Sequence, residues 1–201
     1  MQVIEYFRAT QLQTPASTVF AVLRCLPPRP VADFLLQIYF KYAQTNSFYV
    51  EERWLREKIE ILHESPADIS SSDAAWICAV LMVLAIGSQF VHMSAPPTED
   101  TAGGSYSPDE QEVGVALYHM ASKLIPDVIT IASLESVQAC LLLAHYALPL
   151  DAHGLAYTYL GLSIKMAIQN GMHRKYTGKF FDALTVETRN RLWWNAYTLE
   201  K

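Results

Sequence analysis

The sequence predicts an all-α protein, an irregular bundle of several helices without a sheet. Through most of the chain, apolar residues recur three and four positions apart, which is the spacing of one helix face. No segment shows a convincing alternation of apolar and polar residues, the pattern of a half-buried strand. The 201 residues are 51% hydrophobic and 17% charged, so one sizeable core is expected rather than a disordered chain.

Residues 1–25 are interpreted as a lead-in of uncertain structure, and the domain itself is expected over residues 26–201. A short helix over 17–26 would end at the proline pair that follows it. Two amphipathic helices come next, each with one apolar face and one polar face. Their predicted core residues are Val31, Phe34, Leu35, Ile38 and Tyr42 in the first helix, and Trp54, Leu55, Ile59 and Leu62 in the second.

Residues 74–87 form an uninterrupted apolar run of fourteen residues. A membrane-spanning helix needs about 20 residues, and polar side chains interrupt any extension of this run. The run therefore predicts a buried core helix, capped by Ser71, Ser72 or Asp73, and no membrane span.

Residues 94–107 are rich in Pro, Gly, Ser and Thr, and they predict a mobile surface loop that should be the first site of limited proteolysis. A helix should start directly after it, with Ser107 as N-cap, Pro108 in the first position and Glu110 completing a capping box. This helix is expected to run to Pro126. Its predicted apolar stripe is Val113, Leu117, Met120 and Leu124.

The segment 133–175 predicts two helices joined by a break at Pro149, and the fold is expected to be organised around it. Apolar residues of the second helix occupy two opposite faces: Leu155, Tyr159, Leu162 and Met166 on one, and Tyr157, Leu160, Ile164 and Ile168 on the other. A helix that is apolar on two faces must be packed on two sides, so we expect a central helix. It should end near Asn170, with Gly171 in a left-handed cap.

A last helix is predicted from Val186 to the end of the chain. Its apolar residues form two adjoining rows, namely Val186, Trp193 and Tyr197, and Leu192, Ala196 and Leu199. The two rows make a wide apolar arc, and an uncovered arc of this kind promotes association. We therefore expect the isolated chain to self-associate or to bind another protein.

Composition and cysteine usage restrict the classes of function. The net charge of −5 and a pI near 5.6 argue against a chain that binds nucleic-acid phosphates by itself. The three cysteines, Cys25, Cys78 and Cys140, are an odd number without zinc-site spacing, which favours a reducing compartment over a disulfide framework. The N-terminus lacks the features of a signal or transit peptide. An intracellular protein is expected.

Few residues are candidates for a chemical site. His145, Asp151 and His153 lie close in sequence and suggest a metal or acid–base cluster, but Pro149 intervenes and the spacing matches no common zinc pattern. We expect His145 to be a hydrogen-bonded structural histidine on the same flank as Gln138, with Asp151 and His153 at a turn and helix ends. Cys140 is expected to be a small core residue.

Two further groups have alternative interpretations. Trp193, Trp194 and Tyr197 would line a ligand pocket or, as aromatic residues at helical spacing do more often, belong to the core. The basic cluster His173, Arg174, Lys175 and Lys179 would bind an anion or, as we favour, complement a helix C-terminus. The sequence has no phosphate-binding loop, nucleophile elbow or paired-carboxylate motif. We therefore expect no catalytic residue and no metal site.

Four segments together resemble the fungal-specific transcription factor domain: LPPRPVADFLLQIYFKYAQ from Leu26, SLESVQACLLLAHYAL from Ser133, AYTYLGLSIKMAIQNGMHRK from Ala156 and ETRNRLWWNAYTLEK from Glu187. That domain is the helical regulatory region of zinc binuclear-cluster transcription factors, which are nuclear regulators of metabolic genes. In the family, a separate six-cysteine module binds DNA and two zinc ions, and further helices follow the position of Lys201. This chain resembles only the first part of the domain and lacks the zinc module.

The resemblance implies a noncatalytic regulatory module in the nucleus that responds to a protein partner or a small-molecule effector. No cofactor is expected in this chain, because zinc would belong only to the separate DNA-binding module, and DNA contact would occur only through that module. Two alternatives stay open. The chain is a small helical enzyme or a carrier of lipophilic ligands, or it is a truncated remnant of a longer regulator.

Overall fold

A computed structural model of the chain describes residues 14–94 and 108–201, and this part of the protein is helical without a strand. The main helices are α1 (Ala16–Leu23), α2 (Arg29–Ile38), α3 (Glu52–Glu64), α4 (Ala74–Gln89), α5 (Pro108–Ser122), α6 (Ile125–Ile131), α7 (Leu134–Ala147), α8 (His153–Gln169) and α9 (Ala183–Glu200). The all-α prediction is confirmed. Most of the predicted lead-in, the predicted loop after Ser94 and the predicted cap at Ser107 lie outside the described residues.

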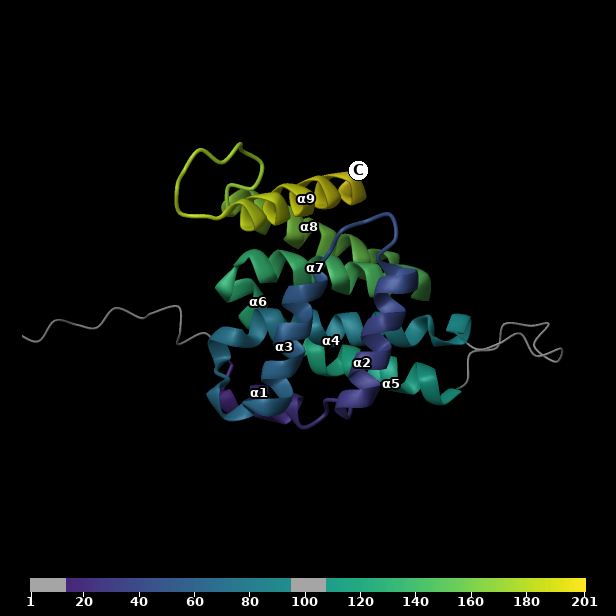
Figure 1. The fold of residues 1–201 in the computed structure, drawn as a ribbon. Helices are drawn as coiled ribbons and strands as arrows, with labels where there is room; N and C mark the ends of the chain where they lie inside the picture. Colours follow the sequence, from purple (N-terminus) through teal and green to yellow (C-terminus); the bar gives the residue numbers. More distant parts are fainter. Residues whose placement is uncertain (1–13, 95–107) are drawn as a thin grey trace, which may run out of the picture.

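The helix α4 lies at the centre of the fold, and every residue from Ala74 to Ser88 is buried. Figure 1 shows α4 crossing the middle of the molecule, with α2 and α3 on one side of it, α7 above it and α5 alongside, while α8 and α9 are stacked on α7. The helix is preceded by a short turn that carries a capping box between Ser70 and Asp73. The predicted buried helix is therefore confirmed, and its N-cap is Asp73, one of the three predicted cap residues, while Ser70 caps the short turn before it.

By length and composition, one helical stretch of the described chain, Ser71–Gln89, could cross a membrane. However, 83% of its apolar window is buried by the other helices. Its outer surface is thus already covered by protein, as expected for the core helix of a bundle.

Two glycines let neighbouring helices approach α4 closely. A Cβ atom on Gly87 would lie 2.4 Å from the Leu35 carbonyl oxygen of α2. A Cβ atom on Gly114 of α5 would lie 2.4 Å from the Ser88 hydroxyl oxygen. Such distances are far shorter than a van der Waals contact, so both helix pairs depend on the missing side chain.

The prediction that residues 155–170 form the central helix is wrong. One face of α8 is buried, mainly against α7, through Ala156, Tyr159, Leu160, Ser163, Met166 and Ala167. The rest of the helix is covered only in part, by α9, and Leu155, Tyr157 and Ile168 are 40%, 65% and 47% exposed. The buried face combines small residues, such as Ala156 and Ala167, with larger ones, such as Tyr159. The end of the helix is as predicted, because Asn170 is the C-cap and Gly171 has a φ of +68°.

Several smaller predictions also change. In α2 the predicted core residues Leu35 and Ile38 are buried, but Val31 and Phe34 are exposed. Ala32 and Leu36 are buried in their place, so the apolar face is only partly as predicted. The helix continues as a π-helical turn over Tyr39–Ala43. Val113 of α5 is exposed because Gly114 faces α4 instead. The predicted core residues of α3, namely Leu55, Ile59 and Leu62, are buried as expected, with Trp54 partly buried.

A helix was missed between α5 and α7. The helix α5 ends at Ser122, before the predicted limit, and α6 begins at Ile125 with Pro126 in its first turn. Proline is compatible with the first turn of a helix, because the backbone N–H at that position has no intrahelical partner. Pro126 was interpreted as the end of one helix, whereas it lies in the first turn of the next helix, α6.

Candidate functional site

The helix α9 covers the outer side of α8 and closes one face of the molecule. It starts at Asp182, whose side chain accepts a hydrogen bond from the Thr185 backbone N–H at 2.7 Å. Its inner side is fixed by the buried residues Leu192 and Ala196. Next to them, the Asn195 side chain donates a hydrogen bond to the Phe48 carbonyl oxygen at 2.8 Å. The helix is thereby joined to the chain segment between α2 and α3.

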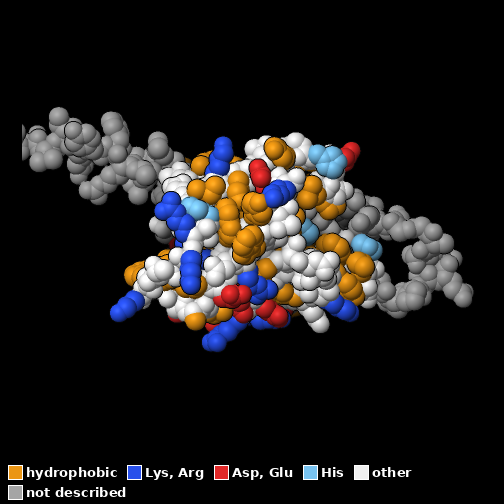
Figure 2. Space-filling view, turned by 90° about the horizontal axis from the view of Figure 1, so that it is seen from above, with side chains coloured by type: hydrophobic (Ala, Val, Ile, Leu, Met, Phe, Trp, Pro, Cys, Tyr) orange, Lys and Arg blue, Asp and Glu red, His pale blue; other side chains and the backbone are white. Residues whose placement is uncertain are grey.

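The outer side of α9 carries an exposed aromatic surface. Trp194 is 62% exposed, and its ring meets that of Tyr197 edge-on at a centroid distance of 6.0 Å. Trp193 is half-buried and contacts both Tyr197 and His173. The expectation that these aromatic residues belong to the core is therefore wrong for Trp194. Figure 2, which looks down on α9, shows hydrophobic side chains gathered in the middle of this face.

Five exposed residues of α9 follow one another at spacings of three and four, which places them on one stripe. This stripe, called the α9 stripe below, consists of Leu184, Glu187, Arg191, Trp194 and Thr198. Most of it forms one wall of an open groove of about 610 Å³, whose other wall is residues 44–48. The Arg191 guanidinium lies 3.8 Å from the centre of the Phe48 ring, so a cation–π contact joins the two walls.

The second wall of the groove is held by a buried polar network. The Gln44 amide oxygen accepts hydrogen bonds from the Tyr49 and Val50 backbone N–H groups at 3.0 Å each. The Gln138 amide donates to the Tyr49 carbonyl oxygen at 3.0 Å, and the Tyr49 hydroxyl lies 3.1 Å from His145 Nδ1. Burial lowers the pKa of His145, which favours the neutral ring. The prediction of a hydrogen-bonded structural histidine is confirmed.

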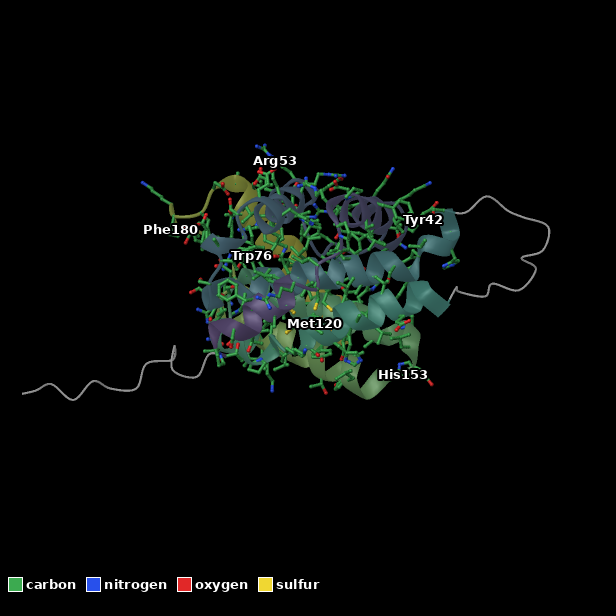
Figure 3. All side chains as sticks on the ribbon, turned by 90° about the horizontal axis from the view of Figure 1, so that it is seen from below. Tyr42, Arg53, Trp76, Met120, His153 and Phe180 are labelled. Atoms are coloured by element: carbon green, nitrogen blue, oxygen red, sulfur yellow. The ribbon has the colours of Figure 1, made fainter. Side chains whose placement is uncertain are left out.

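The other titratable candidates do not assemble into a chemical centre. Asp151 and His153 form an ion pair at 2.7 Å, but both side chains are well exposed and lie at the turn that opens α8. Figure 3 shows His153 at the edge of the molecule. Cys140 is fully buried in the core, where burial raises the pKa of its thiol to about 12. Within residues 14–94 and 108–201, no group of three His, Cys, Asp or Glu side chains is placed to hold a metal ion.

The basic cluster is exposed at the start of the α8–α9 connection. His173, Arg174, Lys175 and Lys179 all lie on the surface, and Arg174 Nε donates to His173 Nε2 at 3.0 Å. The C-cap carbonyl of α8 is bonded instead by a cation from the next helix, because the Arg189 guanidinium donates to the Asn170 carbonyl oxygen at 2.5 Å.

Sequence reasoning missed the residues that shape the groove. Gln44 and Tyr49 gave no signal, because they occupy an irregular segment where helical periodicity does not apply. A signal for the α9 stripe was present, since Leu184, Glu187, Arg191 and Trp194 are regularly spaced. It was overlooked because the stripe mixes apolar and charged residues.

Comparisons with known proteins agree on one family. Residues 36–201 match the family described as "Fungal specific transcription factor domain". An "Uncharacterized transcriptional regulatory protein" of Schizosaccharomyces pombe is 33% identical over 92% of this chain and 22% of its own length. The "Thiamine repressible genes regulatory protein thi1" of the same yeast is 28% identical over 88% of this chain and 22% of its own length.

A third relative is "Activator of stress genes 1" of Saccharomyces cerevisiae, which is 25% identical over 87% of this chain and 18% of its own length. The chain thus spans about a fifth of the length of the curated relatives it matches. No solved structure matches the chain significantly.

Proposed function

Because this chain belongs to the fungal-specific transcription factor domain family, we propose that it is a noncatalytic regulatory module that controls a DNA-binding region located outside these 201 residues. The observation that carries the proposal is the family match over residues 36–201, which includes the helices from α3 to α9 completely and the end of α2. The names of the relatives describe transcriptional regulators and support the same assignment. A nuclear location and a role in metabolic gene expression are part of this proposal.

The net charge of the chain supports separate roles for this module and for the DNA-binding region. The chain has a net charge of −5, and nonspecific DNA affinity comes mainly from Lys and Arg contacts to phosphates. A module of this charge is suited to binding proteins or effectors, with DNA contact supplied elsewhere. In this proposal zinc also belongs to that other region, and the chain itself needs no cofactor.

The α9 stripe is proposed to mediate association with a second copy of the chain. If two α9 helices pair antiparallel about a two-fold axis near Arg189, Leu184 of one copy faces Trp194 of the other. The same axis places Glu187 of one copy opposite Arg191 of the other, in both directions. The stripe is thus self-complementary in charge and apolar contact, which is what a two-fold interface requires.

A transcription assay tests the proposed function directly. The full chain is fused to an unrelated monomeric DNA-binding domain with a reporter gene in a fungal cell, and reporter transcript is measured. The fusion should change transcript level relative to the DNA-binding domain alone, whereas the same fusion with Leu141→Asp, which disrupts the buried core, should not. Equal transcript from all three proteins, at equal nuclear abundance, would contradict the proposal.

A further inference from the structure

A second cavity lies at the opposite side of α7 from α9, where the C-terminal ends of α4 and α7 meet the first half of α5. It is about 440 Å³, which is within the usual range of small-molecule sites, about 300–1,000 Å³. This is the end of the molecule at which Figure 3 labels Tyr42 and His153. The cavity is lined by Ser88, Gln89, Phe90, Gly114, Val115, Tyr146, Pro149 and Leu150.

Tyr146 is held rigidly in the wall of this cavity. Only 3% of the residue is exposed, and its ring stacks on Tyr118 at a centroid distance of 5.2 Å and an interplanar angle of 13°. Tyr118 is in turn fixed by its hydroxyl, which lies 3.3 Å from the Tyr159 hydroxyl. The Gln89 side chain donates to the Tyr146 carbonyl oxygen at 3.3 Å. The direction of the Tyr146 side chain is therefore set before any ligand arrives.

The hydroxyl of Tyr146 is not engaged by any residue that the structure describes. Among the described residues it has no hydrogen-bond partner, although the hydroxyls of its neighbours Tyr118, Tyr159 and Ser88 are all bonded. No fully buried side-chain oxygen in this part of the chain lacks a partner, so the Tyr146 hydroxyl must be reached through the cavity that the residue lines. Burial raises the pKa of Tyr146 to about 12, so the hydroxyl keeps its proton at neutral pH and can donate it.

The chemistry of the lining identifies the class of occupant. Phe90, Val115 and Leu150 offer apolar surface, and none of the lining residues that the structure describes is charged. A charged ligand would lose hydration here without gaining an opposite charge, which is costly. A purely apolar ligand would leave the Tyr146 hydroxyl without a partner in a dry site, which costs free energy as well.

We propose that this cavity binds an uncharged, mostly apolar small molecule whose single polar oxygen accepts a hydrogen bond from the Tyr146 hydroxyl. The bound molecule would contact α4, α5 and α7 at once, so it would stabilise the arrangement of the three helices that form the core. This inference goes beyond the proposed function, because binding is measured on the chain alone and does not depend on any effect on transcription.

Nile red, an uncharged and mostly apolar dye with one carbonyl group, is a suitable probe. Its fluorescence is titrated with the full chain, and saturable binding of one dye per chain is expected. Val115→Trp should fill the cavity and weaken binding at least about tenfold, and Leu150→Lys should weaken it by placing a charge at the rim. Leu150 is 52% exposed, so this second variant should fold normally. The control Trp194→Ala removes the exposed aromatic side chain on α9 and should leave dye binding unchanged.

A matched pair of competitors tests the role of the hydroxyl. Cyclohexyl phenyl ketone and benzylcyclohexane differ only by a carbonyl in place of a CH₂ group. In competition with Nile red, the ketone should bind the unmodified chain with about fivefold higher affinity than the hydrocarbon, which corresponds to one net hydrogen bond. Tyr146→Phe should remove that preference. Tyr146→Phe should keep its melting temperature, because the hydroxyl has no hydrogen-bond partner in the described part of the chain. The inference is overturned if dye binding survives both cavity variants, if it is lost in Trp194→Ala, or if the ketone preference persists in Tyr146→Phe.

Discussion

Asn195 and Phe48 are 147 residues apart in the chain, and the hydrogen bond between the Asn195 amide and the Phe48 carbonyl oxygen fixes α9 against the segment that forms the other wall of the groove. Asn195 is almost completely buried, with 9% of the residue exposed. The bond therefore satisfies two polar groups that water reaches poorly. It also helps to fix the orientation of α9 and therefore the direction in which the α9 stripe faces.

Replacing Asn195 with Ala should lower the free energy of unfolding by about 1–2 kcal/mol, because the Phe48 carbonyl loses its partner. Asn190→Ala, on the same helix but exposed, is the matched control and should change it by less than about 0.5 kcal/mol. Urea unfolding followed by circular dichroism measures both. Equal stability of the two variants would show that this bond does not hold α9 in place.

Gly87→Ala should destabilise the protein by about 1–3 kcal/mol, since the new methyl group would meet the Leu35 carbonyl oxygen and separate α2 from α4. Gly161 is the control, because a Cβ atom there would meet nothing within 4 Å. Gly161→Ala should stabilise α8 by about 0.5–1 kcal/mol, as alanine does in a helix interior. Thermal unfolding should show a lower melting temperature for Gly87→Ala and a higher one for Gly161→Ala. A stabilising Gly87→Ala would disprove the close approach of these helices.

Acid should weaken the fold through His145. Burial lowers the pKa of the folded-state imidazole below its ordinary value of 6.5, so the unfolded chain binds more protons as the pH falls below 6.5. The stability that the neutral ring contributes is fully present above pH 6.5, and it is lost as the pH falls from 6.5 to the lowered pKa of the folded state. His145→Gln should therefore reduce the loss of unfolding free energy that occurs as the pH falls below about 6.5, compared with the unmodified chain. The exposed His153→Gln serves as the control, and an identical pH profile for all three proteins would exclude His145 as the sensitive group.

Self-association should depend on charge order along α9. Glu187→Arg places two cations opposite each other in the proposed pair, and Arg191→Glu places two anions opposite each other, so each should weaken the dimer. The double variant restores opposite charges and should restore association. Trp194→Ala should weaken it at least about tenfold, whereas Tyr157→Ala, which removes a similarly exposed aromatic ring from α8, should not. Sedimentation equilibrium measures the unmodified chain and all five variants. A monomeric unmodified chain at high concentration, or no rescue in the double variant, would refute the pairing.

Leu199 belongs to the predicted apolar arc of the last helix, but it is half-buried against the core cluster, whereas Leu184 is 61% exposed. Leu184 is therefore the better residue to replace together with Trp194 in the association experiments.

The sequence predicted the helices well where each had one clear apolar face or an unbroken apolar run. Residues 74–87 and the α3 face of Leu55 and Ile59 are examples, because burial of such patterns is required by the hydrophobic effect. The central position was assigned to α8 instead of α4, since periodicity counts apolar residues and not the neighbours available to cover them. Trp194 shows the same limit, because only the packing of α8 under α9 decides which side of α9 is buried.

The irregular segments and the cavity could not be predicted from sequence patterns for a different reason. The polar network around Tyr49 includes a contact with His145, which is 96 positions away in the chain. The π-helical turn at Tyr39–Ala43 departs from the regular helical period on which the pattern reasoning rests. The cavity beside Tyr146 arises where the C-terminal ends of α4 and α7 meet the first half of α5, and no local pattern of residues indicates such a space.

Reporter transcript from four fusions tests the central claim, that the chain regulates transcription as an associated module, most directly. The four are the unmodified chain, Glu187→Arg, Arg191→Glu and the double variant, each joined to the monomeric DNA-binding domain and each shown to be folded by circular dichroism. We predict that the unmodified and double-variant fusions change the transcript level to the same extent. The transcript level with either single variant should be close to that of the DNA-binding domain alone. Transcript levels that are equal across all four fusions would contradict the account.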